Sequence, residues 1–186
     1  SFFDTDGKLL STKDSSQFSV TDITYKYDEK RRISSIMSNI NSRDDDYVNS
    51  ISEQHIYFYN ADDSPEKMIR IKNKKDSAVI LFSNDEKGNI SIEKDTKNGA
   101  KFFYYYDSKN RLTDIVQATE YSKRLKPDYV FEYNTAGRIT QMTTVKEGSN
   151  HFYVWKYSYD NGLRIKERLF TDERRLMGSI EYEYAK

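Results

Sequence analysis

One nine-residue pattern recurs along the chain and constrains the fold more than any other feature of the sequence. Its clearest copy is FEYNTAGRI at residues 131–139: two aromatics one residue apart, then Asp or Asn, two variable residues, Gly, Arg and Ile. A three-residue hairpin loop is typically a type I turn followed by a left-handed residue. Glycine takes that conformation without a Cβ penalty. The pattern therefore predicts a β-hairpin with Gly137 in the left-handed position.

The turn sets a register for the two strands that it joins. With residues 135–137 as the loop, Tyr133 faces Ile139 on one side of the sheet and Asn134 faces Arg138 on the other. The same register in other copies again sets a carboxylate opposite a cation: Asp4–Lys8 beside Phe3–Leu9, Asp28–Arg32 beside Tyr27–Ile33, Asp107–Arg111 beside Tyr106–Leu112, and Asp160–Arg164 beside Tyr159–Ile165. Asn110, Arg31 and Leu163 take the glycine position in three of them. Because Gly162 lies one place early, we expect a different turn type there.

Continued along the strands, this register predicts which side chains share a face. On the apolar face of the motif it pairs Ile23 with Met37, Phe102 with Val116 and Trp155 with Leu169, separated from the turn by a polar tier of Ser35, Asp114, Gln141 and Glu167. On the opposite face it pairs Thr24 with Ile36, Phe103 with Ile115, Val130 with Met142 and Val154 with Phe170. Apolar pairs on both faces predict that both faces are partly covered.

The repeat period predicts the number of strands. The second aromatic of the motif falls at Phe3, Tyr27, Tyr59, Phe82, Tyr106, Tyr133, Tyr159 and Tyr184, so the spacing is 23 to 32 residues, which is typical of a repeat architecture. The predicted strands are 1–4, 8–12, 18–28, 31–40, 53–60, 66–73, 77–83, 89–95, 100–107, 111–120, 128–134, 138–146, 151–159, 163–171 and 175–184. Residues 60–65 replace the tight turn in the third copy, and residues 41–46 form a polar loop. We therefore predict an all-β single domain over 1–186: an antiparallel meander of about 15 strands rolled into a barrel-like or flattened closed sheet.

Composition narrows the class of protein. The chain has 30 Lys plus Arg and 30 Asp plus Glu, so no net charge attracts nucleic acid or an anionic membrane. Its 16 Tyr and 10 Phe argue against disorder, since disordered segments are poor in aromatics. It has no cysteine, which excludes disulfides and thiolate chemistry. A chain that begins at Ser1 is expected to be a processed or trimmed product, and no run of 18 apolar residues predicts a membrane-spanning helix.

The motif resembles the YD repeat of Rhs and teneurin-type proteins. The residues that carry the resemblance are Tyr27-Asp28 with Arg32-Ile33, Tyr106-Asp107 with Arg111-Leu112, Tyr133-Asn134 with Gly137-Arg138-Ile139, and Tyr159-Asp160 with Arg164-Ile165. In that family the repeats form a β-sheet that spirals into a hollow shell. The length and the degenerate copies look closer to secreted Bacteroides-type domains of unknown function with a porin-like β-barrel fold. That resemblance implies an extracytoplasmic protein of the periplasm or cell surface, anchored as a lipoprotein.

Several polar clusters are candidate sites, and for each a structural role is favoured. His55 and His151 have no partner spacing of a metal or acid–base site. Asp44-Asp45-Asp46 and the segment 4–7 lack the terminal Glu of a calcium loop. The basic clusters 30–32, 72–75 and 123–126 lie at predicted turns beside acids, which favours solvated turns over phosphate binding. Neither a catalytic motif nor a metal or cofactor site is predicted.

The sequence feature with the clearest functional meaning is an aromatic row. Tyr153, Trp155, Tyr157 and Tyr159 alternate along one predicted strand and share a face, where flat rings with polar edges can stack on sugars. The alternative is that the row is hydrophobic core, which predicts a buried Trp155. We expect a non-enzymatic binding or scaffold domain whose partner is a glycan or another cell-envelope component. An outer-membrane β-barrel and an enzyme with an unrecognised site are the alternatives.

Overall fold

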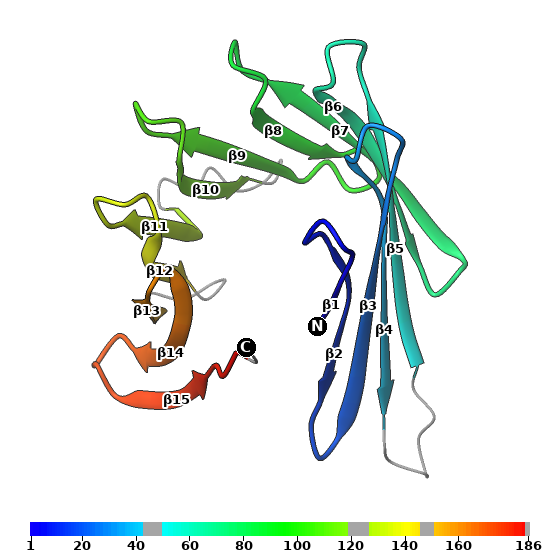
Figure 1. The fold of residues 1–186 in the computed structure, drawn as a ribbon. Helices are drawn as coiled ribbons and strands as arrows, with labels where there is room; N and C mark the ends of the chain where they lie inside the picture. Colours follow the sequence, from blue (N-terminus) through cyan, green and yellow to red (C-terminus); the bar gives the residue numbers. More distant parts are fainter. Residues whose placement is uncertain (43–49, 119–126, 146–150, 185–186) are drawn as a thin grey trace. The chain divides into compact units, whose positions relative to one another are not determined.

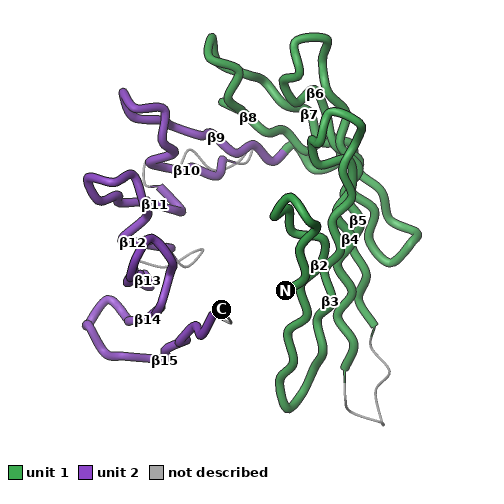
Figure 2. Tube along the Cα trace, in the orientation of Figure 1, with its two compact units in different colours: residues 1–99 green, residues 100–186 purple. Residues whose placement is uncertain are grey.

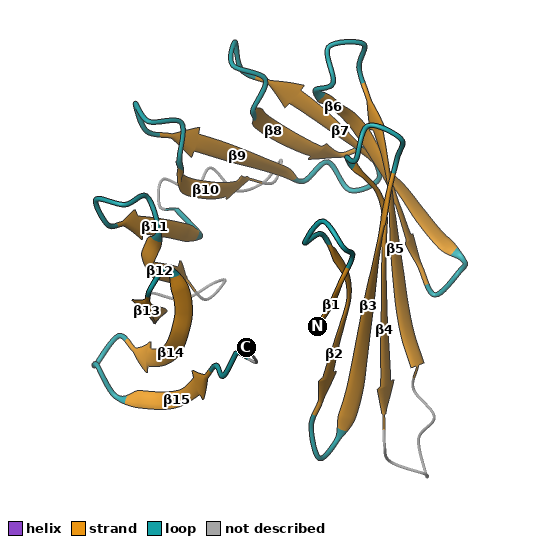
Figure 3. Cartoon of the chain, in the orientation of Figure 1, coloured by secondary structure: helices purple, strands orange, loops and turns teal. Residues whose placement is uncertain are grey.

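Fifteen antiparallel strands follow one another in a single meander sheet. The computed structural model describes residues 1–42, 50–118, 127–145 and 151–184, and these residues contain no helix (Figures 1 and 3). The strands are β1 (Phe2–Phe3), β2 (Leu9–Ser15), β3 (Ser19–Tyr27), β4 (Ile33–Ser42), β5 (Ser50–Tyr59), β6 (Pro65–Lys72), β7 (Asp76–Asn84), β8 (Ile90–Asp95), β9 (Lys101–Tyr106), β10 (Leu112–Ala118), β11 (Tyr129–Tyr133), β12 (Ile139–Val145), β13 (Phe152–Asp160), β14 (Leu163–Thr171) and β15 (Leu176–Glu181). The predicted strand number and meander are confirmed.

The chain divides into two compact units. Residues 1–99 carry β1 to β8, and residues 100–186 carry β9 to β15 (Figure 2). Among the described residues, β1 pairs with β2 alone and β15 with β14 alone, so backbone hydrogen bonds do not close the sheet. The rolled shape and the single domain stay predictions.

The motif turn has the predicted geometry. The Asn134 N–H donates to the Arg138 carbonyl (2.9 Å) and the Gly137 N–H donates to the Asn134 carbonyl (3.0 Å). Gly137 has a φ of 78°, which places it in the left-handed region. The same pair of hydrogen bonds recurs in turns whose left-handed residues are Gly7, Arg31, Asp63, Gly88 and Asn110. In most of these turns the side chain of the first residue caps the loop, as Asn134 Oδ1 does for the Arg138 N–H (2.9 Å). The turn that begins at Asn60 differs, because its Ser64 N–H donates to Asp62 Oδ1 (3.1 Å).

Two copies differ from the sequence-based register. The third turn is regular rather than replaced, because Asp63 takes the left-handed position between Asn60 and Ser64. In the fourth copy the position of the motif tyrosine belongs to Asn84, which faces Ile90, and not to Phe82. The alternation of aromatics suggested Phe82, whereas the turn from Asp85 to Asn89 fixes the register.

The hairpin between β13 and β14 has a two-residue turn. Asn161 and Gly162 both have positive φ, 46° and 88°, as a type I′ turn requires. Asp160 therefore faces Leu163, and Tyr159 faces Arg164. The predicted pairs Asp160–Arg164 and Tyr159–Ile165 are wrong, and the expectation of a different turn type is confirmed.

A β-bulge follows the motif turn and corrects the register of most mid-strand pairs. Tyr133 faces Ile139, yet Glu132 faces Gln141, so Thr140 is the extra residue. The extra residue is Ser34, Glu66, Ser91 and Thr113 in the equivalent hairpins. The Thr140 hydroxyl donates to the Glu132 carbonyl (3.3 Å), and Ser91 and Thr113 make the equivalent bond. A hydroxyl here gives the locally disrupted ladder a side-chain hydrogen bond.

The bulge moves apolar residues to the motif face. Ile36 faces Tyr25, Ile115 faces Tyr104 and Met142 faces Phe131. The predicted pairs that ignored the extra residue are wrong: Ile23–Met37, Thr24–Ile36, Phe102–Val116, Phe103–Ile115 and Val130–Met142. Trp155–Leu169 and Val154–Phe170 are confirmed, because in that hairpin the shorter turn and the bulge at Ile165 offset each other.

Within each unit, motif tyrosines connect a hairpin to the preceding one. The Tyr133 hydroxyl donates to the Leu112 carbonyl (2.7 Å), and the Arg111 guanidinium lies over the Tyr133 ring, 4.6 Å from its centroid. The same pair of contacts joins Tyr27 to Leu9 and Lys8, Tyr59 to Ile33 and Arg32, and Tyr159 to Ile139 and Arg138. Asn84 keeps the hydrogen bond without a ring, donating to the Pro65 carbonyl (2.8 Å). We call this series of contacts the tyrosine ladder.

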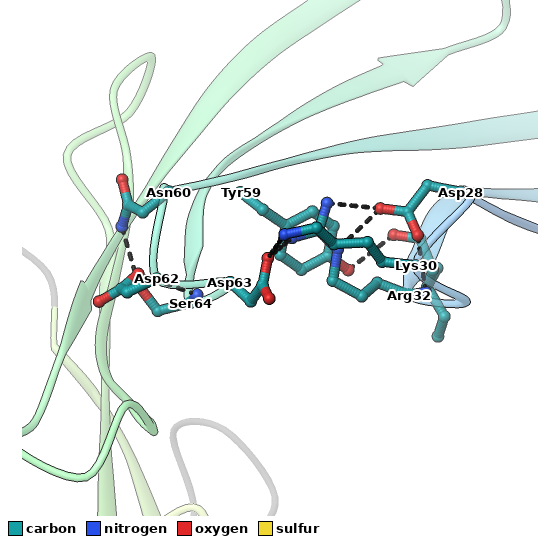
Figure 4. A network of polar contacts seen from close by, with 9 residues as sticks. Asp28, Lys30, Arg32, Tyr59, Asn60, Asp62, Asp63 and Ser64 are labelled. Atoms are coloured by element: carbon teal, nitrogen blue, oxygen red, sulfur yellow. Dashed lines mark hydrogen bonds and ion pairs between the residues drawn. The ribbon is translucent and has the colours of Figure 1, made fainter.

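Figure 4 shows one step of the tyrosine ladder in the first unit. Arg32 stacks on Tyr59, 4.2 Å from the ring centroid, and pairs with Asp28 of its own turn (2.6 Å). Arg32 and Lys30 also reach Asp63 in the next turn. Ion pairs that solvent can reach contribute little alone, so the ring contact and the partly buried hydroxyl bond define this step.

The apolar core of the first unit lies on β5 to β7. Met68, Ala78 and Ile80 are buried and Tyr57 and Phe82 pack against them, with Ile80 fully inaccessible. Phe82 therefore serves as core although it is not the motif aromatic. Nearby, the buried Asp95 carboxylate binds Arg70 (2.5 Å) and accepts a hydrogen bond from the Lys97 N–H (2.8 Å). These partners compensate a buried charge that would destabilise the fold if it were unpaired.

Candidate functional site

The predicted aromatic row lies on β13 in the second unit. Tyr153, Trp155, Tyr157 and Tyr159 occupy alternate positions and are all half-buried. Trp155 lies between Met142 of β12 and Leu169 of β14, its partners in register. Trp155 is therefore neither fully buried nor exposed, a degree of burial that is compatible with a core role and with a binding role.

Two members of the row have contacts within the sheet. The Tyr159 hydroxyl donates to the Ile139 carbonyl (2.8 Å) as part of the tyrosine ladder. Arg164 lies over the Tyr157 ring, 4.4 Å from the centroid. Neither Tyr153 nor Trp155 makes a side-chain hydrogen bond to the described residues of the chain. The half of the row that is available to a ligand is therefore Tyr153 and Trp155.

A buried carboxylate lies beside the row. Glu167 is 9% exposed, faces Tyr157 in register, and pairs with Arg164 (2.8 Å). The Tyr182 hydroxyl donates to the same carboxylate oxygen. Burial, and then the charge of Glu167, raise the pKa of Tyr157, and the hydrogen bond to Glu167 raises that of Tyr182. Both phenols therefore stay neutral at physiological pH, and the cluster orders this end of β13 and β14.

The opposite face of the same strands is hollowed. A groove of about 650 Å³ runs over β12 to β14 and the turn after β14, and its lining is Gln141, Phe152, Val154, Lys156, Phe170, Thr171, Asp172 and Arg174. Phe152 is 36% exposed, and Val154 faces Phe170 across the strands. The groove therefore offers an apolar floor in contact with solvent, and we call it the β13 groove.

Charged side chains surround that floor. Lys156 lies over the Phe170 ring, 5.8 Å from the centroid, and Arg174 is exposed on the turn. Asp172 pairs with His151 (2.7 Å), which lowers the pKa of the Asp172 carboxyl. An apolar floor with cations at its margin suits a ligand with flat apolar surfaces and polar edges.

The other candidates from the sequence lie in structural contacts. His55 binds Glu53 (2.6 Å), which also pairs with Lys72 (3.3 Å). Asp4 Oδ1 accepts the backbone N–H groups of residues 6 and 8 and so caps its turn. Arg31 pairs with Asp4 (3.4 Å) and with the carboxylate of residue 6. The predicted clusters at 44–46 and 123–126 lie outside the described residues.

Sequence reasoning missed the β13 groove. Its signal was present in the predicted pair Val154–Phe170, which the structure confirms on the face away from Trp155. An apolar pair there indicates a covered surface or an apolar hollow, and the alternation pattern does not distinguish the two. The turn after β14, which closes one end, follows no Gly or Asn signal because Arg174 takes the left-handed position (φ 64°).

The described residues lack two features. They hold no group of three or more His, Asp or Glu side chains close enough to share a metal ion. In the part of the chain that the structure describes, no helix has the length and apolarity needed to span a membrane.

Comparisons with known proteins find similarity in structure alone. No protein-family model matches the chain, and no curated protein matches it. A porin-like protein from Bacteroides uniformis has a TM-score of 0.47 at 11% identity, over 87% of this chain and 86% of that one. A TcdB2–TccC3 chain, crystallised as TcdB2–TccC3–Cdc42, has a TM-score of 0.40 at 11% identity, over 96% of this chain and 11% of that one. This chain thus spans about a tenth of that protein, and likeness at these values supports no inference about function.

Proposed function

We propose that this chain is a non-catalytic binding or scaffold domain that works outside the cytoplasm and takes a carbohydrate ligand. The observation that carries the proposal is the surface of β13, where Trp155 is partly accessible on one face and Phe152 is exposed in a groove of about 650 Å³ on the other. Aromatic faces pack against the apolar faces of sugar rings, and polar groups at the edges bind hydroxyls.

The tyrosine ladder supports a scaffold role. Each step that has a tyrosine, at residues 27, 59, 133 and 159, joins neighbouring hairpins through a hydroxyl–carbonyl bond and a cation over a ring, as Tyr133 shows with Leu112 and Arg111. Such repeated contacts hold the strands in register. A binding surface on rigid strands keeps its geometry better than one on loops.

The extracytoplasmic location rests on the resemblance of the chain, in its length and its degenerate copies, to secreted Bacteroides-type porin-like domains. With it come export, a lipid anchor and a second candidate partner, another protein of the cell envelope. Exposed Lys26, Glu132 and Lys156 within strands weigh against an outer-membrane barrel, because a lysine at the bilayer midplane costs roughly 2–4 kcal/mol.

The proposal is tested by titration calorimetry against neutral and acidic oligosaccharides. We expect at least one oligosaccharide to bind. Its affinity is then measured for Trp155→Ala and for Phe152→Ala. If only Trp155→Ala loses affinity, the ligand binds the aromatic row. If only Phe152→Ala loses affinity, the ligand binds the β13 groove. Tyr105→Ala is the matched control, since Tyr105 is 52% exposed on another strand. Absence of binding across the panel overturns the carbohydrate ligand, and chemical conversion of any sugar overturns the non-catalytic assignment.

A further inference from the structure

Two cations lie directly opposite each other beside the β13 groove. Lys156 of β13 and Arg168 of β14 are partners in register, so their side chains leave the same face of the sheet. Asp or Glu faces Lys in the other charged pairs of the described strands: Lys13–Asp22, Glu53–Lys72, Lys72–Asp76 and Lys166–Glu181. Like charges in this position repel and destabilise the strand pair. Among the described residues, neither Lys156 nor Arg168 has a carboxylate within ion-pair distance.

The neighbouring acids are committed to other partners. Glu132, two strands away in the same row, accepts a hydrogen bond from Gln141, and Asp172 pairs with His151. Arg174 adds a third cation at the other end of the β13 groove. The groove thus combines an apolar floor with unneutralised positive charge, and an anion bound there would relieve the repulsion between Lys156 and Arg168.

We propose that the β13 groove binds an acidic sugar, a uronic acid or a sulfated residue. Phe152 and Phe170 supply the apolar floor on which the ring lies, and Lys156 with Arg168 receives the carboxylate or sulfate at its edge. Arg174 is placed to meet the acid group of an adjoining residue. This inference rests on the proposed carbohydrate-binding function and names the ligand class and the site. A neutral sugar would leave the two cations unneutralised, and a simple anion would leave the aromatic floor unused.

The test compares matched sugars that carry an acid group with counterparts in which that group is neutral or absent. Titration calorimetry in 50 mM salt uses oligogalacturonate and its methyl ester, and a sulfated oligosaccharide with its desulfated counterpart. We expect an acidic member to bind at least tenfold more tightly than its neutral counterpart, and the difference to shrink in 0.5 M salt. Lys156→Gln and Arg168→Gln should each remove most of that preference. Lys166→Gln is the matched control. Lys166 lies on β14, as Arg168 does, and its ammonium already pairs with Glu181 (2.5 Å).

A second measurement needs no ligand. Because Lys156 and Arg168 repel, Lys156→Gln should raise the thermal unfolding midpoint in low salt and have no effect in 0.5 M salt, whereas Lys166→Gln should not raise it. Equal affinity for acidic and neutral sugars, or a preference that survives Lys156→Gln, overturns the acidic-sugar site and leaves a carbohydrate-binding domain standing. Failure of every sugar to bind overturns both proposals. If Lys156→Gln leaves the midpoint unchanged in low salt, Lys156 and Arg168 do not repel each other, and the argument for the acidic-sugar site fails.

Discussion

The left-handed position of the motif turn, which Gly137 occupies, tolerates glycine and asparagine better than β-branched residues. Gly137 has a φ of 78° with open space around the site where a Cβ would lie, so backbone strain and not a clash decides substitutions. We predict that Gly137→Val lowers the free energy of unfolding by at least ~1 kcal/mol, because a β-branched residue is forced to positive φ. Gly137→Asn should be nearly neutral. Urea denaturation measures both.

A control position separates this effect from side-chain size. Gly178 lies in β15 with no neighbour within reach of an added Cβ and without a positive φ, so Gly178→Val should not destabilise the chain. Equal losses for Gly137→Val and Gly137→Asn would contradict the left-handed assignment.

Arg31 presents the opposite case, a large side chain held at a φ of 63°. The strained backbone costs about 1–2 kcal/mol, while its contacts with Asp4 and Asp6 are exposed ion pairs worth about 0–1 kcal/mol. We predict that Arg31→Gly leaves the free energy of unfolding unchanged or raises it by up to ~1 kcal/mol, measured by urea denaturation. A loss above ~1 kcal/mol would show that the ion pairs outweigh the strain.

At the scale of the elements, the tyrosine ladder is the contact between successive hairpins. Tyr133→Phe keeps the ring under Arg111 and removes the hydroxyl that donates to the Leu112 carbonyl. We predict a loss of about 1–2 kcal/mol, since a partly buried carbonyl loses its donor. Tyr105→Phe should change stability by less than ~0.5 kcal/mol, because that side chain is 52% exposed. Equal urea midpoints for the two variants would contradict a structural role for the hydroxyl.

How far the sequence predicts these elements follows from the range of each signal. The turn FEYNTAGRI determines its own hydrogen bonds and the pair Tyr133–Ile139, so strands and turns are predictable. The register beyond it depends on the bulge at Thr140, whose sequence signal is weaker. That signal is a hydroxyl residue directly after Ile139, together with the spacing of three residues between the apolar Ile139 and Met142. A strict alternation of faces overlooks that insertion.

The candidate site shows the same limit. The sequence places Tyr153 and Trp155 on one face of one strand, as the structure confirms. It does not predict that Arg164 covers Tyr157 within the hairpin, because that contact depends on the shorter turn and the bulge at Ile165. It also does not predict the bond from Tyr159 to Ile139, which joins separate hairpins. The β13 groove depends on Arg174 in a turn without glycine, which local pattern does not predict.

At the scale of the whole molecule, the described strands of each unit pair with their neighbours in the chain. Stability in such an arrangement is close to a sum over repeats and the contacts between neighbouring repeats. Most of the hairpin turns also carry an aspartate. The Asp107 carboxylate accepts from Arg111 and the Asp85 carboxylate from Asn89, which lowers the pKa of each below the ordinary 3.8. The ion pair with Lys97 lowers the pKa of Asp76 in the same direction.

These shifts predict the dependence of stability on pH. A carboxyl whose pKa is lower in the folded state stabilises the fold above its unfolded pKa, and that contribution is lost as pH falls through the folded value. The urea midpoint should therefore be nearly constant from pH 7 to about 5, and should fall as the pH drops below about 4. Asp107→Asn, which removes one such group and its pairing with Arg111, should lower the midpoint at pH 7 and reduce the fall between pH 5 and 2. A midpoint that stays constant to pH 2, or an Asp107→Asn curve parallel to that of the parent, would show that the turn carboxylates contribute no stability through their charge.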